Sequence, residues 1–481
     1  MNTIARRGPF RIMKLNSGTA LGQVSTDCAR VMGESHLFYQ TGGRRPRVSR
    51  AEGIYLWDSS GKRYIDASSG PMVSNIGHSN PRVLDAMKRQ MDSATFAYRL
   101  HFENEVAESL ATLTASLMPE GLDRIFFVSG GSECVESSLK LARQYAYVTG
   151  QQQRWKVISL FPSYHGSTLG AVAVTGMHQF VEPFCDMIRE MPKIPAATCY
   201  LDHDDLSHEE RGLRYAGMLR SEIERQGPET VLAFIMEPVG GASTGALVAP
   251  NSWYSEIQDI CREYGVLLIA DEVMTGAGRT GRFLASEHWN LQPDIIAMAK
   301  GFAAGYAPLG AMAARREIVD AVIENGGFAH GYTYAGNPLA CAAGLAVLEE
   351  VLQQNLIGNA RQRGANLKAS LTALQDRYPF IGDVRGKGLL LAFELVADRD
   401  TMEPLPAELN AHVELVEEAY NRGLIIYSRR TRGGTVGDHF MVCPPLIVTD
   451  ADLDEIIQLL VDSLDAFADS SGLPVNREKM P

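Results

Sequence analysis

Two stretches decide the fold of this chain: VLLIADEVMT, residues 266–275, and DIIAMAKGF, residues 294–302. Each contains a run of five apolar residues that ends at a charged side chain, VLLIA before Asp271 and IIAMA before Lys300. Short apolar runs of this kind predict buried strands. Strands that are apolar along their whole length are typical of parallel sheets covered by helices on both faces. The two stretches therefore predict an α/β sheet with a carboxylate and an amine at the ends of its strands.

Lys300 and Asp271 together indicate a pyridoxal phosphate site. A lysine at the end of an apolar strand has a lowered pKa, which makes its amine nucleophilic. An aspartate at a neighbouring strand end can pair with a protonated ring nitrogen, and pyridoxal phosphate enzymes need both groups. Alone, the aspartate would more often cap a turn and the lysine would be solvated. The combination favours a catalytic pair.

The rest of the chain alternates strands with helical spacing, which predicts a mostly parallel sheet with flanking helices. Residues 54–66 alternate like a hairpin that turns at SSG. The expected domains are residues 1–66, an N-terminal arm and part of a small domain; 67–335, a large cofactor-binding domain; and 336–481, the rest of a small α+β domain built from both chain ends. The other expected strands are 124–128, 157–161, 231–236, 389–394 and 424–427, and the expected helices are 81–91, 103–117, 133–147 and 339–353.

Composition restricts the class of protein. With 45% hydrophobic and 21% charged residues in 481, the chain is typical of soluble globular proteins. Its net charge of −12 argues against nucleic acid as a partner, and the sequence contains no run long enough to span a membrane. Seven scattered cysteines without CxxC spacing predict reduced thiols in a cytoplasmic enzyme, without a metal site. Basic residues before Asp27 suit an arm lying on a partner subunit or a frayed end, and a transit peptide is a weaker alternative.

Three further motifs follow predicted strands. Ser129-Gly130-Gly131-Ser132-Glu133 is a turn into a helix, and such a turn binds phosphate through backbone N–H groups and the helix dipole. Tyr164-His165-Gly166 offers an aromatic ring that could stack on a pyridine ring or pack in the core. Glu237, before a glycine-rich loop, could hold other site residues or cap the loop.

Two other patterns have alternative explanations. GAGRTG, residues 276–281, matches the dinucleotide fingerprint G-x-G-x-x-G, but it neither follows a strand directly nor opens a helix, so nicotinamide binding is not favoured. Arg429, Arg430 and Arg432 are expected in a loop. One of them could clamp a substrate carboxylate, although such a run is more often a solvated face.

At this point the chain resembles the class III pyridoxal-phosphate-dependent aminotransferases of fold type I, the group that includes ω-amino acid:pyruvate and 4-aminobutyrate transaminases. The resemblance covers about residues 30–450. The motifs that carry it are FFVSGGSECVESSLKLAR, SYHGST, FIMEPVGGASTG, LLIADEVMTGAGRTGRF, DIIAMAKGFAAGYAPLGA and GYTYAGNPLACAAG.

The resemblance implies a role for each matching residue. Lys300 would form the Schiff base with the cofactor, Asp271 would pair with its ring nitrogen, and Glu237 would lie beside the ring. Val273 and Tyr164 would enclose the ring, and His165 is also expected to contact the cofactor. Gly130, Gly131 and Ser132 would hold the phosphate, with Thr333 reaching it from the neighbouring subunit. The protein would be a homodimer with active sites at its interface, or a tetramer.

Two departures from the family pattern affect substrate choice more than chemistry. Many relatives carry Asn-Ser-Gly where this chain has Ser129-Gly130-Gly131, and amine-accepting relatives often carry tryptophan where it has Met72. Met72 is therefore expected to contact substrate. Phe38 is a further expected substrate contact. The expected activity moves an amino group from an amine or ω-amino acid to pyruvate or 2-oxoglutarate. An aminomutase, a racemase or a decarboxylating aminotransferase would use the same residues, and a catalytically silent dimeric binding protein is a remote alternative.

Overall fold

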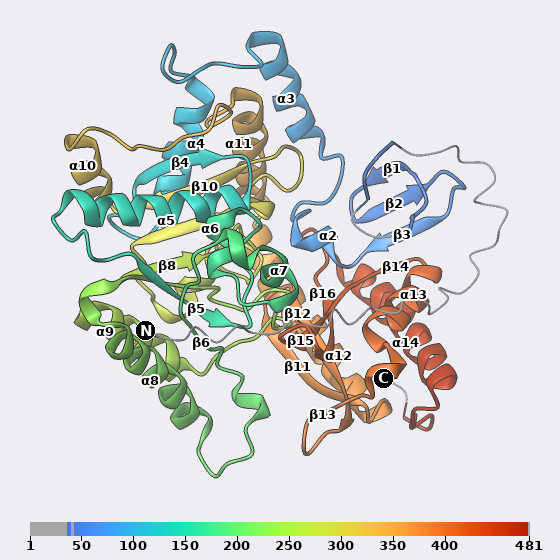
Figure 1. Cartoon of the computed structure of the whole chain (residues 1–481). Helices are drawn as coiled ribbons and strands as arrows, with labels where there is room; N and C mark the ends of the chain where they lie inside the picture. Colours follow the sequence, from blue (N-terminus) through green and yellow to red (C-terminus); the bar gives the residue numbers. More distant parts are fainter. Residues whose placement is uncertain (1–35, 40–42, 480–481) are drawn as a thin grey trace. The chain divides into compact units, whose positions relative to one another are not determined.

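The computed structural model describes residues 36–39 and 43–479 (Figure 1). The chain divides into two compact units, one ending at Arg47 and one beginning at Val48. The described residues of the first unit form neither helix nor strand. The folded elements discussed below all belong to the second unit. Among the described helices, none combines the length and the apolar character needed to cross a bilayer.

The largest sheet of the second unit has seven strands in the order β4-β10-β9-β8-β7-β5-β6. β5 to β9 run parallel, and β10 runs antiparallel to both of its neighbours. This confirms the expected mostly parallel sheet, although the sequence analysis did not anticipate β10 or β6. The strands are β4 Arg124–Val128, β5 Lys156–Phe161, β6 Lys193–Pro195, β7 Val231–Met236, β8 Leu267–Asp271, β9 Ile295–Met298 and β10 Gly310–Ala314.

Helices cover both faces of this sheet, which is why its strands are apolar throughout. In β9, Ile295 and Ala297 pack in a cluster with α5 and α10, whereas Ile296 and Met298 pack with α4 and α11. α8 and α9 extend the second layer over β5 and β7 (Figure 1). These helices are α4 Glu105–Ser116, α5 Gly131–Val148, α8 His208–Gln226, α9 Asn251–Tyr264, α10 Arg316–Glu324 and α11 Pro338–Gln353.

Two smaller sheets join segments from distant parts of the sequence. One has the order β1-β2-β3-β14, and β14 pairs with β3 in parallel, so both ends of the second unit contribute to it. The other contains β11, β12, β16 and β15 in antiparallel order, with β13 beside β12. The strands are β1 Val48–Glu52, β2 Tyr55–Asp58, β3 Arg63–Asp66, β11 Ile381–Lys387, β12 Leu390–Asp398, β13 Glu403–Pro404, β14 Leu424–Ile425, β15 Tyr427–Arg432 and β16 Val436–Val442.

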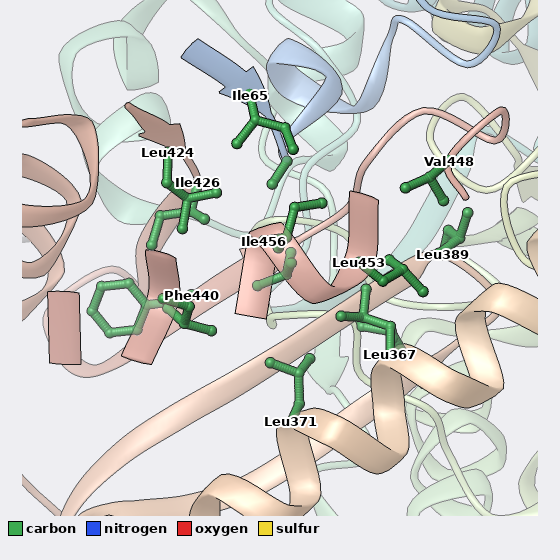
Figure 2. Close-up of a cluster of buried hydrophobic side chains, with 14 of the residues drawn as sticks. Ile65, Leu367, Leu371, Leu389, Leu424, Ile426, Phe440, Val448, Leu453 and Ile456 are labelled. Atoms are coloured by element: carbon green, nitrogen blue, oxygen red, sulfur yellow. The ribbon is translucent and has the colours of Figure 1, made fainter. Parts of the chain in front are cut away.

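One apolar core supports both smaller sheets. Figure 2 shows Ile65 of β3, Leu424 of β14 and Phe440 of β16 among the side chains of this core. The helices that complete this core are α12 Leu356–Arg377, α13 Ala411–Asn421 and α14 Asp450–Ser471. The small α+β part therefore depends on both chain ends, as the sequence predicted. The boundaries at 66/67 and 335/336 stay a prediction, because residues from Val48 onward form one compact unit.

The hairpin expected at residues 54–66 is present as β2 and β3, and the expected helix at 81–91 is α3 Pro81–Ser93. One expectation was wrong: the arginine segment is not a loop. Arg429, Arg430 and Arg432 lie on β15, which pairs with β16. Glycine and threonine in the turn that follows suggested a loop, whereas pairing with β16 extends the strand through all three arginines.

Candidate active site

Asp271 is the last residue of β8, a central strand of the seven-stranded sheet, and it is almost fully buried. One of its oxygens, Oδ2, lies 2.7 Å from Nδ1 of His165. The other, Oδ1, accepts a hydrogen bond of 3.0 Å from the backbone N–H of Val273. Two fixed contacts hold the carboxylate in one orientation. A buried carboxylate fixed in this way can pair with a cation that enters the site.

Lys300 follows β9, the strand that pairs with β8 in parallel. Its φ of +46° lies in the left-handed region, which is uncommon for residues other than glycine and is often found at functional sites. Burial lowers the pKa of the amine from its ordinary value of 10.5, while the charges of Asp271 and Glu237 raise it. The fold therefore brings these three groups together, and it favours the neutral amine that a nucleophile needs.

Glu237 follows β7, the other neighbour of β8. Its carboxylate accepts hydrogen bonds from the backbone N–H groups of Tyr164, at 3.3 Å, and Gly241, at 3.0 Å. Burial raises its pKa, the charge of Asp271 adds to the rise, and His165 opposes it. Three adjacent strand ends thus contribute Tyr164, His165, Glu237 and Asp271 to one connected group.

At the N-terminus of α5, two glycines stand where the neighbouring residues leave no room for a side chain. Helix α5 begins at Gly131, and a Cβ on this residue would lie 2.8 Å from Cγ1 of Val273. A Cβ on Gly166 would lie 2.7 Å from Oγ of Ser132, which accepts a hydrogen bond from Ser167. The first N–H groups of a helix have no partner within the helix, and they attract anions.

These residues fit pyridoxal phosphate. The glycine cradle accommodates a flat ring and its phosphate, Asp271 suits a protonated ring nitrogen, and Lys300 suits an aldehyde. The groups at the strand ends were predictable from the sequence, whereas the hydrogen bond from Ser167 and the contact between His165 and Asp271 were not. Ser167 belongs to the motif SYHGST. Its place in that motif, close to Tyr164 and His165, is the only feature of the sequence that could have pointed to it. The predicted roles of the individual residues stay predictions.

The remaining expected site residues lie in different surroundings. Thr333 is exposed in a turn, and Phe38 is exposed in the first unit. Met72 is fully buried in an apolar cluster that Tyr427 joins from β15. Substrate contacts by Phe38 and Met72 stay predictions.

The three arginines of β15 differ in what they contact. Arg430 pairs with Asp438, and Arg432 donates to the carbonyl of Met402. Arg429 is exposed, makes no ion pair within the described part of the chain, and lies with its guanidinium 4.8 Å from the ring centre of Tyr427.

Comparison with known proteins agrees with this geometry. The family model described as aminotransferase class-III matches residues 39–464. The chain is 39% identical to the uncharacterized aminotransferase YodT of Bacillus subtilis over 88% of this chain and 95% of that protein. It is 34% identical to the putrescine–pyruvate aminotransferase of Pseudomonas aeruginosa over 88% and 91%. An amine transaminase from an uncultivated Pseudomonas species, solved in its PLP-bound form, superimposes with a TM-score of 0.84 at 32% identity, covering 90% of this chain and 99% of that one.

The chain belongs to the class III aminotransferases. It has the fold of the pyridoxal-phosphate-dependent transaminases of fold type I, and it is an enzyme that transfers amino groups.

Proposed function

We propose that this chain transfers an amino group from an amine or ω-amino acid to a keto acid with pyridoxal phosphate bound among Lys300, Asp271 and the start of α5. One observation supports the proposal most directly. The amine of Lys300 is buried, and the charges of the Asp271 and Glu237 carboxylates act on it. When bound, pyridoxal phosphate supplies a ring that accepts the electrons released from the donor carbon. Class III relatives with a PLP-bound structure support this cofactor.

The chain's own residues divide the work. Lys300 would hold the cofactor through Nζ, and its free amine would move a proton at the donor carbon as a general base. Asp271, oriented by His165, holds a proton at the ring nitrogen. Gly131 and Ser132 bind the phosphate through the N-terminus of α5. Because burial lowers the pKa of Lys300, more of its amine is neutral near neutral pH than in an exposed lysine.

Arg429 is the arginine that we assign to the carboxylate of the keto acid. Its guanidinium lies 4.8 Å from the ring centre of Tyr427. Burial raises the pKa of Tyr427, while the charge of Arg429 lowers it and Tyr164 raises it. Tyr427 thus connects Arg429 to the residues around the cofactor. Guanidinium and carboxylate groups form strong paired hydrogen bonds. The putrescine–pyruvate relative makes pyruvate a suitable first acceptor to test.

A homodimer with shared active sites is the assembly that we propose, and a tetramer would extend it. Thr333 is exposed beside Tyr334, whose side chain is 65% exposed and contacts Phe96. Leu100 and Phe102, on the segment that Asn104 ties to Gly336, are 74% and 70% exposed. Exposed apolar residues gathered around one turn are typical of interaction surfaces. Light scattering of the wild type and of Leu100→Asp distinguishes these assemblies from a monomer.

We also propose a cytoplasmic location. The six described cysteines are all unpaired and five of them are buried, which suits a reducing compartment. Cell fractionation tests this directly, and recovery in an exported fraction would contradict it.

Borohydride reduction followed by peptide mapping tests the proposed function. We expect the pyridoxyl label on the peptide that contains Lys300. A screen of diamine, ω-amino acid and simple amine donors against pyruvate and 2-oxoglutarate then measures the loss of each keto acid. Label on another residue, or no amino transfer with any donor, would contradict the proposal.

A further inference from the structure

Arg279 is a fully buried arginine outside the groups described above. Burial lowers the pKa of its guanidinium to about 10, so the group stays charged at neutral pH. It makes no ion pair within the described part of the chain. Instead, it donates to the carbonyls of Leu389, Cys443 and Pro444 and to Oγ of Ser69. Hydrogen bonds offset the cost of burying a charge, and those of Nη1 and Nη2 fix the guanidinium in place, whereas the buried Nε has no hydrogen-bond partner among the described residues.

The strongest side-chain contact of Arg279 is with Asn75. Nη2 of Arg279 donates to Oδ1 of Asn75 at 2.7 Å, and Nδ2 of Asn75 donates to the carbonyl of Ala277 at 3.0 Å. The backbone of Asn75 also accepts from the N–H of Leu446 at 2.7 Å. The amide of Asn75 therefore has one orientation, although it lies in a segment far from Arg279 in the sequence.

That amide lies directly against the residue after Lys300. A Cβ added to Gly301 would be 2.1 Å from Nδ2 and 2.6 Å from Cγ of Asn75. Gly301 is buried, and Lys300 before it has a left-handed backbone. A residue in this conformation persists only where its surroundings hold it. Asn75 is the side chain that closes one side of the Lys300 turn.

We propose that Asn75 and Arg279 are positioning residues for Lys300: the guanidinium fixes the amide, and the amide fixes the turn that presents the amine. The proposal rests on the proposed function of Lys300. Neither residue needs to touch substrate, because they act through Gly301. A shift of about 1 Å in a reacting group can cost on the order of 100-fold in rate.

The pKa of Lys300 in the cofactor-free protein distinguishes the two roles. If Asn75 and Arg279 only stabilised the fold, replacing them would leave this pKa unchanged. Asp271 and Glu237 are the charged groups that act on this amine, and burial is the larger effect. Acetic anhydride labelling across pH, with peptide mass mapping, gives the labelling midpoint of Lys300. In Asn75→Ala the turn relaxes toward water, so we expect the midpoint to rise toward 10.5. With cofactor and substrates, we expect kcat to fall on the order of tenfold or more with little change in KM.

Two matched controls separate positioning from stability. Asn359 also donates its amide to backbone carbonyls, those of Leu446 and Val448, and Arg361 donates to the carbonyl of Gly281 beside the Arg279 turn. Asn359→Ala and Arg361→Lys remove comparable contacts without touching the Lys300 turn. We expect both to keep the wild-type midpoint, whereas Arg279→Lys moves it as Asn75→Ala does.

A double variant tests the contact itself. Gly301→Ala alone places a methyl group into the amide of Asn75, so we expect loss of activity and a displaced midpoint. In Gly301→Ala/Asn75→Ala the methyl group occupies the vacated space, and we expect partial recovery relative to Gly301→Ala. Such non-additivity is typical of residues in contact. This comparison remains informative if Arg279→Lys fails to fold.

Wild-type midpoints and kcat in Asn75→Ala, or additive losses in the double variant, would overturn the positioning role. Failure of the proposed function is a separate result, because it would show as absent amino transfer by the wild type. The labelling midpoint is measured without cofactor, so it still tests how the turn is held.

Discussion

The seven-stranded sheet and the five-stranded sheet place their charged residues differently. β7, β9 and β10 are buried along their whole length, and the charged groups Glu237 and Lys300 come only after their strands end. In the five-stranded sheet, Glu394 lies within β12, opposite His439 of β16. A sheet covered by helices on both faces has room for charge only at its ends. The five-stranded sheet carries a buried charge within β12 because Arg385 pairs with Glu394 there.

Arg385 and Glu394 lie on one face of the five-stranded sheet, called here the charged face, and this face contacts the loop that follows Glu237. Arg385 of β11 pairs with Glu394 at 2.8 Å and donates to the carbonyl of Gly245 at 2.7 Å. Tyr200 donates to the same carboxylate of Glu394 at 2.8 Å. Phe393 and Phe440, on the opposite face, stack in the core. The seven-stranded sheet therefore supplies the charged groups of the site. The five-stranded sheet holds in place the loop that begins after one of these groups, Glu237.

Loss of Lys300 should have the largest effect if the strand ends carry the chemistry. In Lys300→Ala we expect kcat to fall by about 10⁴-fold, because both the cofactor's attachment and the general base are lost. Single-turnover assays of amine donor alone measure this loss. Lys193→Ala is the matched control, since Lys193 is a half-buried lysine with a lowered pKa on β6 and away from the site. An equal loss in both variants would contradict the assignment.

Breaking the charged face should affect stability more than chemistry. In Glu394→Ala the buried guanidinium of Arg385 loses one of its two carboxylate partners and keeps Asp383, so we expect the free energy of unfolding to fall by about 1–3 kcal/mol. Denaturant titration measures the change. The control is Asp259→Ala, which removes an exposed pair with Arg262 and should change stability by less than about 0.5 kcal/mol. A similar small change in Glu394→Ala would show that the network is not structural.

Arg429 tests whether the five-stranded sheet also contributes to substrate binding. In Arg429→Ala we expect the KM for pyruvate to rise about tenfold with kcat little changed, the cost of one charge-assisted hydrogen bond. Arg430→Ala and Arg432→Ala are controls on the same strand whose guanidinium groups have partners. Saturation curves with pyruvate give the KM of each variant, and we expect a raised KM only in Arg429→Ala. An unchanged KM in Arg429→Ala would remove the proposed carboxylate site.

The smallest expected effect is a change in the pKa of Lys300 when Glu237 is replaced. Its negative charge favours the protonated amine of Lys300 and so raises the pKa of that amine. In Glu237→Gln the charge is gone, so we expect the labelling midpoint of Lys300 in the cofactor-free protein to move to lower pH. Acetic anhydride labelling across pH measures it. An unchanged midpoint would contradict this prediction, because it would mean that the carboxyl group of Glu237 carries no charge that acts on the amine.

The main strands could be predicted from the sequence because each is a local apolar run. The predicted bounds of β4 and β7 match the structure, and those of β8 and β9 differ from it by one residue at their ends. β10 was missed because GAMAA is rich in small residues that do not distinguish a strand from a loop. β15 was mistaken for a loop because pairing with β16 is a contact that its own residues do not encode.

The sequence by itself determined the α/β class, the amine at position 300 and the carboxylate at position 271, because an apolar run followed by a charged residue is a local pattern. Only the tertiary structure decided which arginine lies beside Tyr427, and how Arg279 and Asn75 close the turn of Lys300. Those contacts join residues from distant segments, and no spacing along the chain reports the distance between their side chains. The physical reason is that packing, rather than local pattern, selects the partner of a buried polar group.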